Sequence, residues 1–184
     1  MVNAGNLEDI AYYNEQLREI NNLYKENISI ILLGYKPELD KDMSMAGINF
    51  QYSKPVSIIH WYKELKSREI DLLFIPLIQN IFNDTSENLK KYIDAGENSI
   101  PVIVCNAFPY KNVIQDGING FVYNKREDFI YYLKNLLSKG NFPLVKICGE
   151  HAYQDAIGKF SLRKNRESLL RVIAFHENDS EVKN

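Results

Sequence analysis

The sequence predicts an α/β domain with a Rossmann-like arrangement, in which helices cover both faces of a mostly parallel sheet. Three short runs, 28–34, 69–77 and 100–104, are rich in apolar and β-branched residues. Uninterrupted apolar runs are typical of strands buried on both faces of a parallel sheet. Amphipathic helical segments separate these runs, and alternation of strands with helices indicates βαβ connections. We therefore expect a three-layer α/β/α sandwich.

The chain has the size of one domain. It has 184 residues, of which 45% are hydrophobic, and this is enough to form a sizeable core. We expect the domain to span residues 1–175. Residues 176–184 are polar and lack periodicity, so we expect them to form a disordered C-terminal tail.

Composition argues against several functional classes. The net charge of −2 gives no global electrostatic basis for binding nucleic acid or an anionic membrane. No apolar run approaches the roughly 18 residues of a transmembrane helix, and the N-terminus lacks the basic and apolar parts of a signal peptide. Cys105 and Cys148 are too few for a disulfide framework. We expect a cytoplasmic protein with reduced thiols.

A first helix is predicted over residues 7–26. Its apolar positions repeat every three or four residues: Leu7, Ile10, Tyr13, Leu17, Ile20 and Tyr24. Asn6 can cap this helix, and Gly5 precedes it. No clear strand comes before Gly5, which indicates that the first strand is truncated or very short. Beyond a polar loop, another strand is predicted at 48–52.

An amphipathic helix is predicted over residues 56–68, and the central strand follows at 69–77. His60 has no second His, Cys or carboxylate at metal-ligand spacing, so we interpret it as a packed or solvated residue. Asp71 stands at the start of the strand, whereas ligands of open α/β sheets lie at the carboxyl ends. By that rule the site should gather around residues 76–83, residues 105–110 and the turn near Gly5.

The stretch 82–104 reads as a loop, a short helix, a turn and a buried strand. Asp84 and Glu87 fit the two ends of a capping box, and Gly96 fits the end of the helix. One face of this helix is apolar, with Leu89, Tyr92 and Ile93. The other mixes carboxylates and lysines: Glu87, Lys90, Lys91 and Asp94. This polar face has two interpretations, a solvated surface with ordinary ion pairs or a surface that binds a ligand.

The rest of the chain, from residue 105 on, shows few chemical signals. We interpret Cys105 as a small buried apolar residue, since no His or basic cluster adjoins it to activate the thiol. Asp-Gly and Asn-Gly turns follow within 113–124. Helices are then predicted at 125–140, 144–158 and 162–175. Gly149 and His151 fall within the second of these helices without an apparent partner.

An ordered series of short motifs runs through residues 70–124. Its members are Asp71, Leu72, Pro76 and Leu77; Phe82 and Asn83; Lys91 and Asp94; Pro101, Val102 and Ile103; and Ile114, Asp116, Gly117, Asn119 and Gly120. In this order and at these spacings they resemble the nucleotide-sugar-binding, C-terminal half of GT-B glycosyltransferases. The likeness is to the retaining enzymes of the group 1, or family 4, type that build bacterial surface polysaccharides.

This resemblance implies one Rossmann-like half of a hexosyltransferase, with the active site in the cleft between two halves. The substrate would be a nucleotide-sugar, and the acceptor a glycan or a lipid-linked molecule. The length leaves no room for the acceptor-binding N-terminal domain, so an excised domain or a partner chain is implied. We expect a cytoplasmic location, with peripheral attachment to the inner face of the membrane as an option. No metal or other cofactor is expected, because positive side chains and a helix dipole stabilise the departing nucleoside diphosphate in such enzymes.

Six residues are candidates for donor binding by this resemblance: Gly5, Tyr52, Asn83, Ser86, Lys91 and Asp94. Gly5 lies in a turn that would approach the diphosphate. Tyr52, with Ser53 and Lys54 beside it, is a candidate by position, because the loop at the end of this strand contacts the base in the family; an ordinary strand end is the other interpretation. Asn83 and Ser86 offer short polar groups to phosphate or sugar hydroxyls.

Lys91 and Asp94 carry the more definite roles. Lys91 would neutralise the diphosphate as it leaves. Asp94 would accept hydrogen bonds from two ribose hydroxyls. The chain also departs from the family pattern. Asp94 replaces a Glu, Ser86 stands where many members have a second Glu, and no basic residue is evident near Gly5. No catalytic residue is assigned.

Two alternatives stay open. The first is a degenerate GT-B domain that no longer catalyses and acts as a scaffold or interaction module in a larger glycosyltransferase, which those departures favour. The second is another Rossmann-like protein, such as a receiver domain or a nicotinamide-dependent enzyme. A receiver needs an Asp at the carboxyl end of a strand, and a dinucleotide enzyme needs G-x-G-x-x-G after the first strand. We find neither in this sequence.

Overall fold

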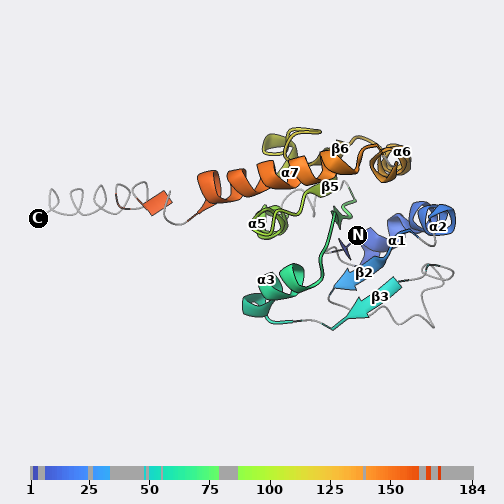
Figure 1. Cartoon of the computed structure of the whole chain (residues 1–184), viewed down its shortest axis with the longest axis horizontal. Helices are drawn as coiled ribbons and strands as arrows, with labels where there is room; N and C mark the ends of the chain where they lie inside the picture. The colour runs from blue at the N-terminus through green and yellow to red at the C-terminus, as the bar shows by residue number, and fades with distance from the viewer. Residues whose placement is uncertain are drawn as a thin grey trace, which may run out of the picture.

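A six-stranded sheet in the order β3-β2-β1-β4-β5-β6 forms the centre of the protein (Figure 1). The computed structural model describes residues 2–3, 7–24, 27–33, 48, 50–54, 56–78, 87–138, 140–161, 165–166 and 170. All neighbouring strands run parallel. The strands are β1 (Val2–Asn3), β2 (Ile30–Leu33), β3 (Phe50–Ser53), β4 (Leu73–Ile75), β5 (Val102–Cys105) and β6 (Phe121–Tyr123). This order is that of a doubly wound Rossmann fold, so the predicted fold class is confirmed.

The first strand has only two residues, yet it lies in the middle of the sheet. Val2 is opposite Ile31 of β2 on one side and Leu73 of β4 on the other. Two residues are too few to stand out as an apolar run, and this is why no clear strand was expected here. The strand order reverses between β1 and β4, and this reversal is the topological switch point of the sheet.

Helices cover both faces of the sheet (Figure 1). On one side lie α1 (Leu7–Tyr12), α2 (Asn14–Leu23) and α6 (Arg126–Leu137), and on the other lie α3 (Ile58–Ser67) and α5 (Lys90–Gly96). A single-turn 3-10 helix, η2, spans Tyr110–Asn112. α7 (Phe142–Asp155) packs on α5 and continues into a π-helical turn, η3 (Ala156–Phe160). No helix in the described part of the chain is long and apolar enough to cross a membrane.

The C-terminal predictions lie mostly outside the described residues. Within the predicted helix 162–175, residues 165–166 and 170 are helical. The predicted tail at 176–184 falls wholly outside the described residues. The next predicted helix toward the N-terminus, 144–158, is observed as α7 and the first part of η3.

The predicted helix over 7–26 is divided in two at Tyr13. This residue takes φ −103° and ψ 11°, between α1 and α2. Its ring is buried, and its hydroxyl donates to the carbonyl oxygen of Leu77, 3.2 Å away, at the exit of β4. The periodic apolar pattern gave no sign of the break, because Tyr13 fits the inner face of one continuous helix over residues 7–26.

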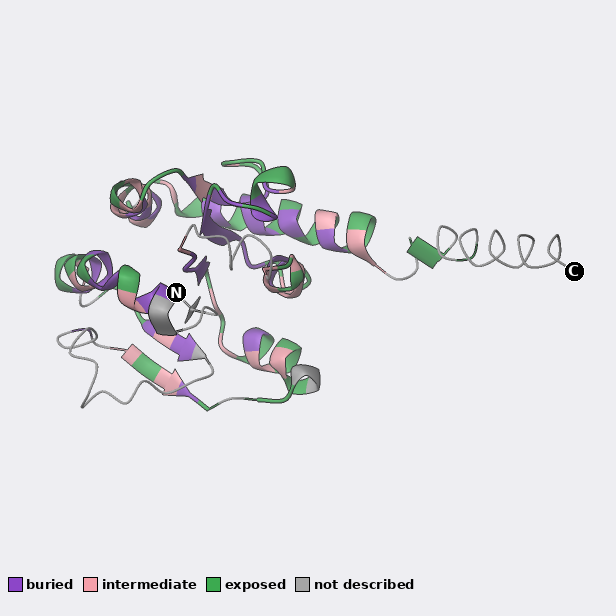
Figure 2. Cartoon of the chain, turned by 180° about the vertical axis from the view of Figure 1, so that it is seen from behind, coloured by how far each residue is buried: buried purple, intermediate pink, exposed green. Residues whose placement is uncertain are grey.

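Buried aromatic rings join one helical layer to the sheet. The rings of Phe74 in β4 and Phe129 in α6 stack with centroids 4.4 Å apart, and Tyr13 meets Phe74 edge to face at 5.2 Å. Figure 2 shows buried residues concentrated in the strands and on the inner sides of the helices. The apolar runs of the sequence therefore form the core, as buried parallel strands require.

The glycines of the predicted Asp-Gly and Asn-Gly turns serve the backbone, as expected. Gly117 has φ +72°, a conformation that other residues adopt at a cost. A Cβ on Gly120 would lie 2.9 Å from Cγ2 of Ile114 and 3.3 Å from the carbonyl oxygen of Val102. Both positions require glycine, and neither indicates a role in binding.

Candidate functional site

The carboxyl edge of the sheet carries a pocket of about 310 Å³. The exits of β4, β5 and β6 contribute to it together with the end of α1. Its lining residues are Tyr12, Tyr13, Leu77, Ile78, Cys105, Tyr123, Asn124, Lys125, Arg126 and Glu127. Ligands of open α/β sheets lie at this edge, beside the switch point. The pocket is therefore the first candidate for a functional site.

Asp9 fixes the helix beside the switch point to the exit of β4. It lies in α1, is 4% exposed, and its Oδ1 accepts a hydrogen bond from the backbone N–H of Ile78 at 2.9 Å. Hydrogen bonds to a carboxylate are stronger than those between neutral groups. Asp9 therefore holds α1 against the segment that leaves β4. Sequence reasoning missed this role, because Asp9 reads as an ordinary polar residue near a helix start.

Two tyrosine hydroxyls form the floor of this pocket. The hydroxyl of Tyr123 donates to that of Tyr13 at 2.9 Å, and Tyr13 donates in turn to the carbonyl oxygen of Leu77. Burial raises the pKa of both tyrosines well above the usual value. They therefore remain protonated at neutral pH and serve as hydrogen-bond donors, not as bases.

Positive charge borders the pocket where α6 begins. Arg126 places its guanidinium 4.8 Å from the centre of the Tyr12 ring, and its Nη1 donates to the carbonyl oxygen of Tyr12 at 3.2 Å. Nε of Arg126 is buried without a hydrogen-bond partner, and Glu127 lies 3.7 Å from it. Lys125 is exposed beside it. The resemblance places the basic residue for the diphosphate after the first strand, so sequence reasoning did not single out Lys125 and Arg126. Their position directly after β6 is the signal that could have found them.

The structure places Lys91 and Asp94 in α5, each in an ion pair. Nζ of Lys90 lies 2.5 Å from Oδ2 of Asp94, and Nζ of Lys91 lies 3.1 Å from Oε1 of Glu87. The hydroxyl of Tyr110 also donates to Glu87, at 2.7 Å. Ordinary ion pairs, one of the two interpretations of this helix face, are therefore present. They are partly exposed, and such pairs contribute only about 0–1 kcal/mol, so a ligand could displace them.

The predicted capping box is wrong in part. α5 begins at Lys90, so Glu87 precedes the helix and does not stand at its third position. The backbone N–H of Lys90 instead donates to Oδ1 of Asn88 at 2.9 Å. Asp84, the other half of the predicted box, lies outside the described residues. Gly96 is the last residue of α5, as predicted, and Tyr92 faces the core.

The structure does not bring Tyr52 next to α5. Tyr52 is half-buried in β3, the outermost strand, and β2 and β1 separate that strand from β4. Its neighbour Ser53 is engaged within the fold, since its hydroxyl donates to Glu64 at 2.7 Å and accepts from Arg68 at 2.9 Å. Lys54 is exposed. Gly5, Asn83 and Ser86, the other candidates, lie outside the described residues.

Neither cysteine forms a disulfide, and both are buried. Burial, with a smaller effect from the charge of Asp116, raises the pKa of the Cys148 thiol to about 11. Cys105 is 3% exposed and its thiol donates to the carbonyl oxygen of Leu77, which confirms its interpretation as a small buried residue. Across the described residues, no three His, Cys, Asp or Glu side chains gather as they would around a metal ion.

The Asp-Gly and Asn-Gly motif is a structural turn. Asp116 accepts hydrogen bonds from the backbone N–H of Val122 at 2.8 Å and from the hydroxyl of Tyr132 at 2.6 Å. The Asn119 amide donates to Asp155 of α7 at 2.6 Å. His151, which had no apparent partner in the sequence, places Nδ1 3.0 Å from the carbonyl oxygen of Ile118. These contacts fasten the turn before β6 to α6 and α7.

Three solved structures share this fold. HepE of Anabaena, solved with UDP-glucose, is 13% identical with a TM-score of 0.67, and the match covers 94% of this chain and 48% of that one. TarM of S. aureus, a mutant solved with fondaparinux, α-GlcNAc-glycerol and UDP, is 16% identical with a TM-score of 0.67 and coverage of 92% and 34%. The C-terminal domain of a group 1 glycosyl transferase, LpcC of Francisella tularensis, is 17% identical with a TM-score of 0.59 and coverage of 86% and 84%.

Sequence comparisons add little. No family model matches the chain. A curated protein named "Putative ankyrin repeat protein", from Acanthamoeba polyphaga mimivirus, is 26% identical over 113 residues, which are 60% of this chain and 17% of that protein. The chain thus spans less than a fifth of that relative, about a third of TarM and about half of HepE. The chain shares its fold with the C-terminal domain of that group 1 glycosyl transferase, which is the fold that the sequence motifs predicted.

Proposed function

We propose that the chain is the donor-binding half of a glycosyltransferase and that it binds a nucleotide-sugar at the carboxyl edge of its sheet. The observation that carries the proposal is the sheet order with its switch point between β1 and β4, next to a pocket at that edge. Proteins of the same fold were solved with UDP and with UDP-glucose, which supports this class of ligand.

The donor contacts that we propose use α5 and the start of α6. Asp94 accepts hydrogen bonds from two ribose hydroxyls, a role that its two carboxylate oxygens suit. Lys91 and Arg126 neutralise the diphosphate, and this charge stabilises the departing nucleoside diphosphate. Binding exchanges the ion pairs of Asp94 with Lys90 and of Lys91 with Glu87 for contacts with the ligand. Gly5, Asn83, Ser86 and Tyr52 remain part of the proposal by resemblance.

The reaction we propose moves the sugar to a polysaccharide or glycolipid acceptor, of the kind assembled in bacterial surface-glycan biosynthesis. An N-terminal acceptor-binding domain, in the same or another chain, would complete the cleft. The support is the coverage of the neighbours, since this chain spans about half of HepE. We propose that no metal and no other cofactor takes part, because the basic side chains supply the positive charge the leaving group needs.

A second candidate function is a scaffold that no longer catalyses. The ion pairs at α5 favour it, because Asp94 and Glu87 each already have a lysine partner. Ser86, at the position where many of the resembled enzymes have a Glu, also favours a scaffold. In that case the chain would hold a partner domain without turning over a sugar donor.

Titration with UDP tests the donor site through matched variants of α5. We expect Asp94→Asn to weaken UDP binding by about tenfold or more, because charged hydrogen bonds to the ribose are lost. Glu97→Gln, an exposed carboxylate just after the same helix, should leave affinity unchanged. Lys91→Gln should weaken binding, whereas Lys90→Gln should not, since Lys90 only competes for Asp94.

Calorimetry gives these affinities directly. If Lys91→Gln and Lys90→Gln change the affinity equally, Lys91 does not contact the nucleotide. If Asp94→Asn binds UDP as tightly as the wild type, Asp94 does not contact it either. A wild-type protein that binds no nucleotide would support the scaffold instead.

A further inference from the structure

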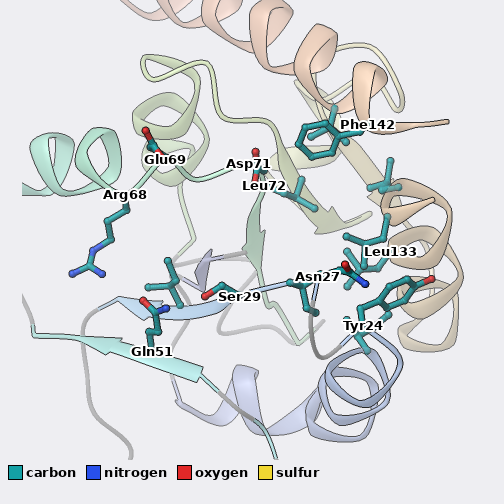
Figure 3. Close-up of a pocket in the computed structure, with 16 residues that line it drawn as sticks. Tyr24, Asn27, Ser29, Gln51, Arg68, Glu69, Asp71, Leu72, Leu133 and Phe142 are labelled. Carbon is teal, nitrogen blue, oxygen red and sulfur yellow. The ribbon is translucent and has the colours of Figure 1, made fainter. Parts of the chain in front are cut away.

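A second, larger pocket lies at the amino edge of the sheet, opposite the proposed donor site. It has a volume of about 420 Å³. It lies where α2, α3 and α6 end, where α7 begins, and where the chain enters β2 and β4. Figure 3 shows Tyr24, Leu133 and Phe142 on one side of it and Gln51 and Arg68 on the other. This volume falls in the range of small-molecule sites.

The wall of this pocket is apolar. It is formed by the side chains of Ile20, Tyr24, Ile28, Ile31, Leu72, Leu133, Leu136, Leu137, Phe142 and Val145. Phe142 is 41% exposed at the rim, and Nζ of Lys146, which does not line the pocket, lies 5.6 Å from the centre of its ring. Lys146 thus already supplies this ring with a cation, and Phe142 contributes apolar surface to the rim. Such a wall favours a ligand with an apolar body.

The charges on the rim favour a cationic group. Glu69 and Asp71 are exposed, and no ion pair within the described residues engages either carboxylate. Arg68, the lining residue of opposite charge, is already bound by Glu64 at 2.6 Å and donates to Ser53 at 2.9 Å. The rim is therefore negative, and it would repel a carboxylate at the end of an apolar chain.

We propose that this amino-edge pocket binds a small amphipathic amine, with the apolar body against the helix ends and the ammonium group beside Asp71 and Glu69. Gln51 and Asn27 line the pocket and can orient polar atoms of the ligand. The proposal is independent of the donor site, because the two pockets have no lining residue in common.

Octylamine and octanoate form the test pair, since they share a chain length and differ in charge. We expect octylamine to bind and to shift NMR signals of Ser29, Asp71 and Phe142, with octanoate at least about threefold weaker, as for exposed charges. Asp71→Asn should weaken octylamine by about two- to fivefold and bring the two probes closer together. Glu150→Gln, an exposed carboxylate of α7 that lines neither pocket, is the matched control.

A second variant pair tests the apolar wall. Phe142→Ala should weaken both probes by about threefold or more, because apolar contact is lost, whereas Tyr131→Ala, an exposed aromatic of α6 outside the pocket, should not. Circular dichroism confirms that each variant is folded. Failure of octylamine to bind, equal affinity for octanoate, or signal shifts confined to the carboxyl edge would each overturn the proposal. UDP titrated into the same sample reports on the donor site separately.

Discussion

Two glycines set how closely α7 packs against its neighbours. A Cβ on Gly149 would lie 2.1 Å from the carbonyl oxygen of Ser99, and one on Gly96 would lie 2.8 Å from that of Ala152. Both clashes involve backbone atoms, which cannot rotate away as a long side chain can. Ser99 itself has φ +57°, a conformation that is uncommon outside glycine. The turn after α5 and the middle of α7 are therefore fitted to each other.

The change Gly149→Ala should destabilise the protein by about 1–3 kcal/mol, since the added methyl group forces backbone apart in a packed interface. Gly158→Ala is the matched control, because nothing lies within 4 Å of a Cβ at that position in η3. For Gly158→Ala we expect the free energy of unfolding to rise by less than about 1 kcal/mol. Urea unfolding followed by circular dichroism measures both. Similar losses in the two variants would contradict the close packing of α7 on Ser99.

At the scale of residues, sequence reasoning worked where a local rule applies. Gly117 follows from turn chemistry, because an Asp-Gly pair signals a positive φ. Gly149 carries no such signal, since its need arises from Ser99, fifty positions away along the chain. The same holds at the candidate site. The ion partners of Lys91 and Asp94 are four residues away and fit helical spacing, whereas the contact of Arg126 with Tyr12 depends on the fold.

A polar network joins four elements on one side of the sheet. Asp155 in α7 accepts from the hydroxyl of Tyr92 in α5 at 3.1 Å, from the Asn119 amide at 2.6 Å and from Lys159 of η3 at 2.8 Å. Burial acts to raise the pKa of Asp155, but hydrogen bonds from Lys159, Asn119 and Tyr92 outweigh it and hold the pKa below its usual value. The charged carboxylate is thus the form that the fold stabilises.

The pKa of Asp155 is lower in the folded protein than in the unfolded chain. Its contribution to the free energy of unfolding is therefore fully present above the unfolded-state pKa of about 4, and it is lost as the pH falls through the folded-state pKa. Asp155→Asn should therefore cost about 1–2 kcal/mol at pH 7, and this difference should shrink below about pH 4. Unfolding at a series of pH values measures it. Glu150→Gln, an exposed carboxylate of the same helix, is the control. A difference that stays constant down to pH 3 would rule out the charged network.

At the scale of elements, the long apolar runs predicted the sheet well, because a strand buried on both faces needs an uninterrupted run. The errors occur where tertiary contacts decide a boundary. Tyr13 divides the first helix because its hydroxyl reaches Leu77 across the fold. α5 begins later than predicted, at Lys90, because the side chain of Glu87 is bound by Tyr110 and Lys91 instead of capping a helix.

The molecule has pockets at two opposite edges of its sheet. The carboxyl edge, with the basic residues Lys125 and Arg126, suits an anionic nucleotide, whereas the amino edge, with Glu69 and Asp71, suits a cation. The fold class and the first of these edges could be predicted from the order of strands and helices. The amino-edge pocket could not, because its wall combines the end of α2 and the entries to β2 and β4 with the much later α6 and α7.

The central claim is that the carboxyl edge binds a nucleotide, and backbone amide NMR tests it most directly. The protein is titrated in turn with UDP, GDP, ADP and CMP. We expect one of the four to shift the signals of Ile78, Cys105 and Asp94 at concentrations below about 1 mM, the affinity range of a weak but specific site. Signals at the amino edge, such as those of Ser29 and Asp71, should stay in place. If none of the four nucleotides shifts a signal at the carboxyl edge, the chain has no donor site of its own.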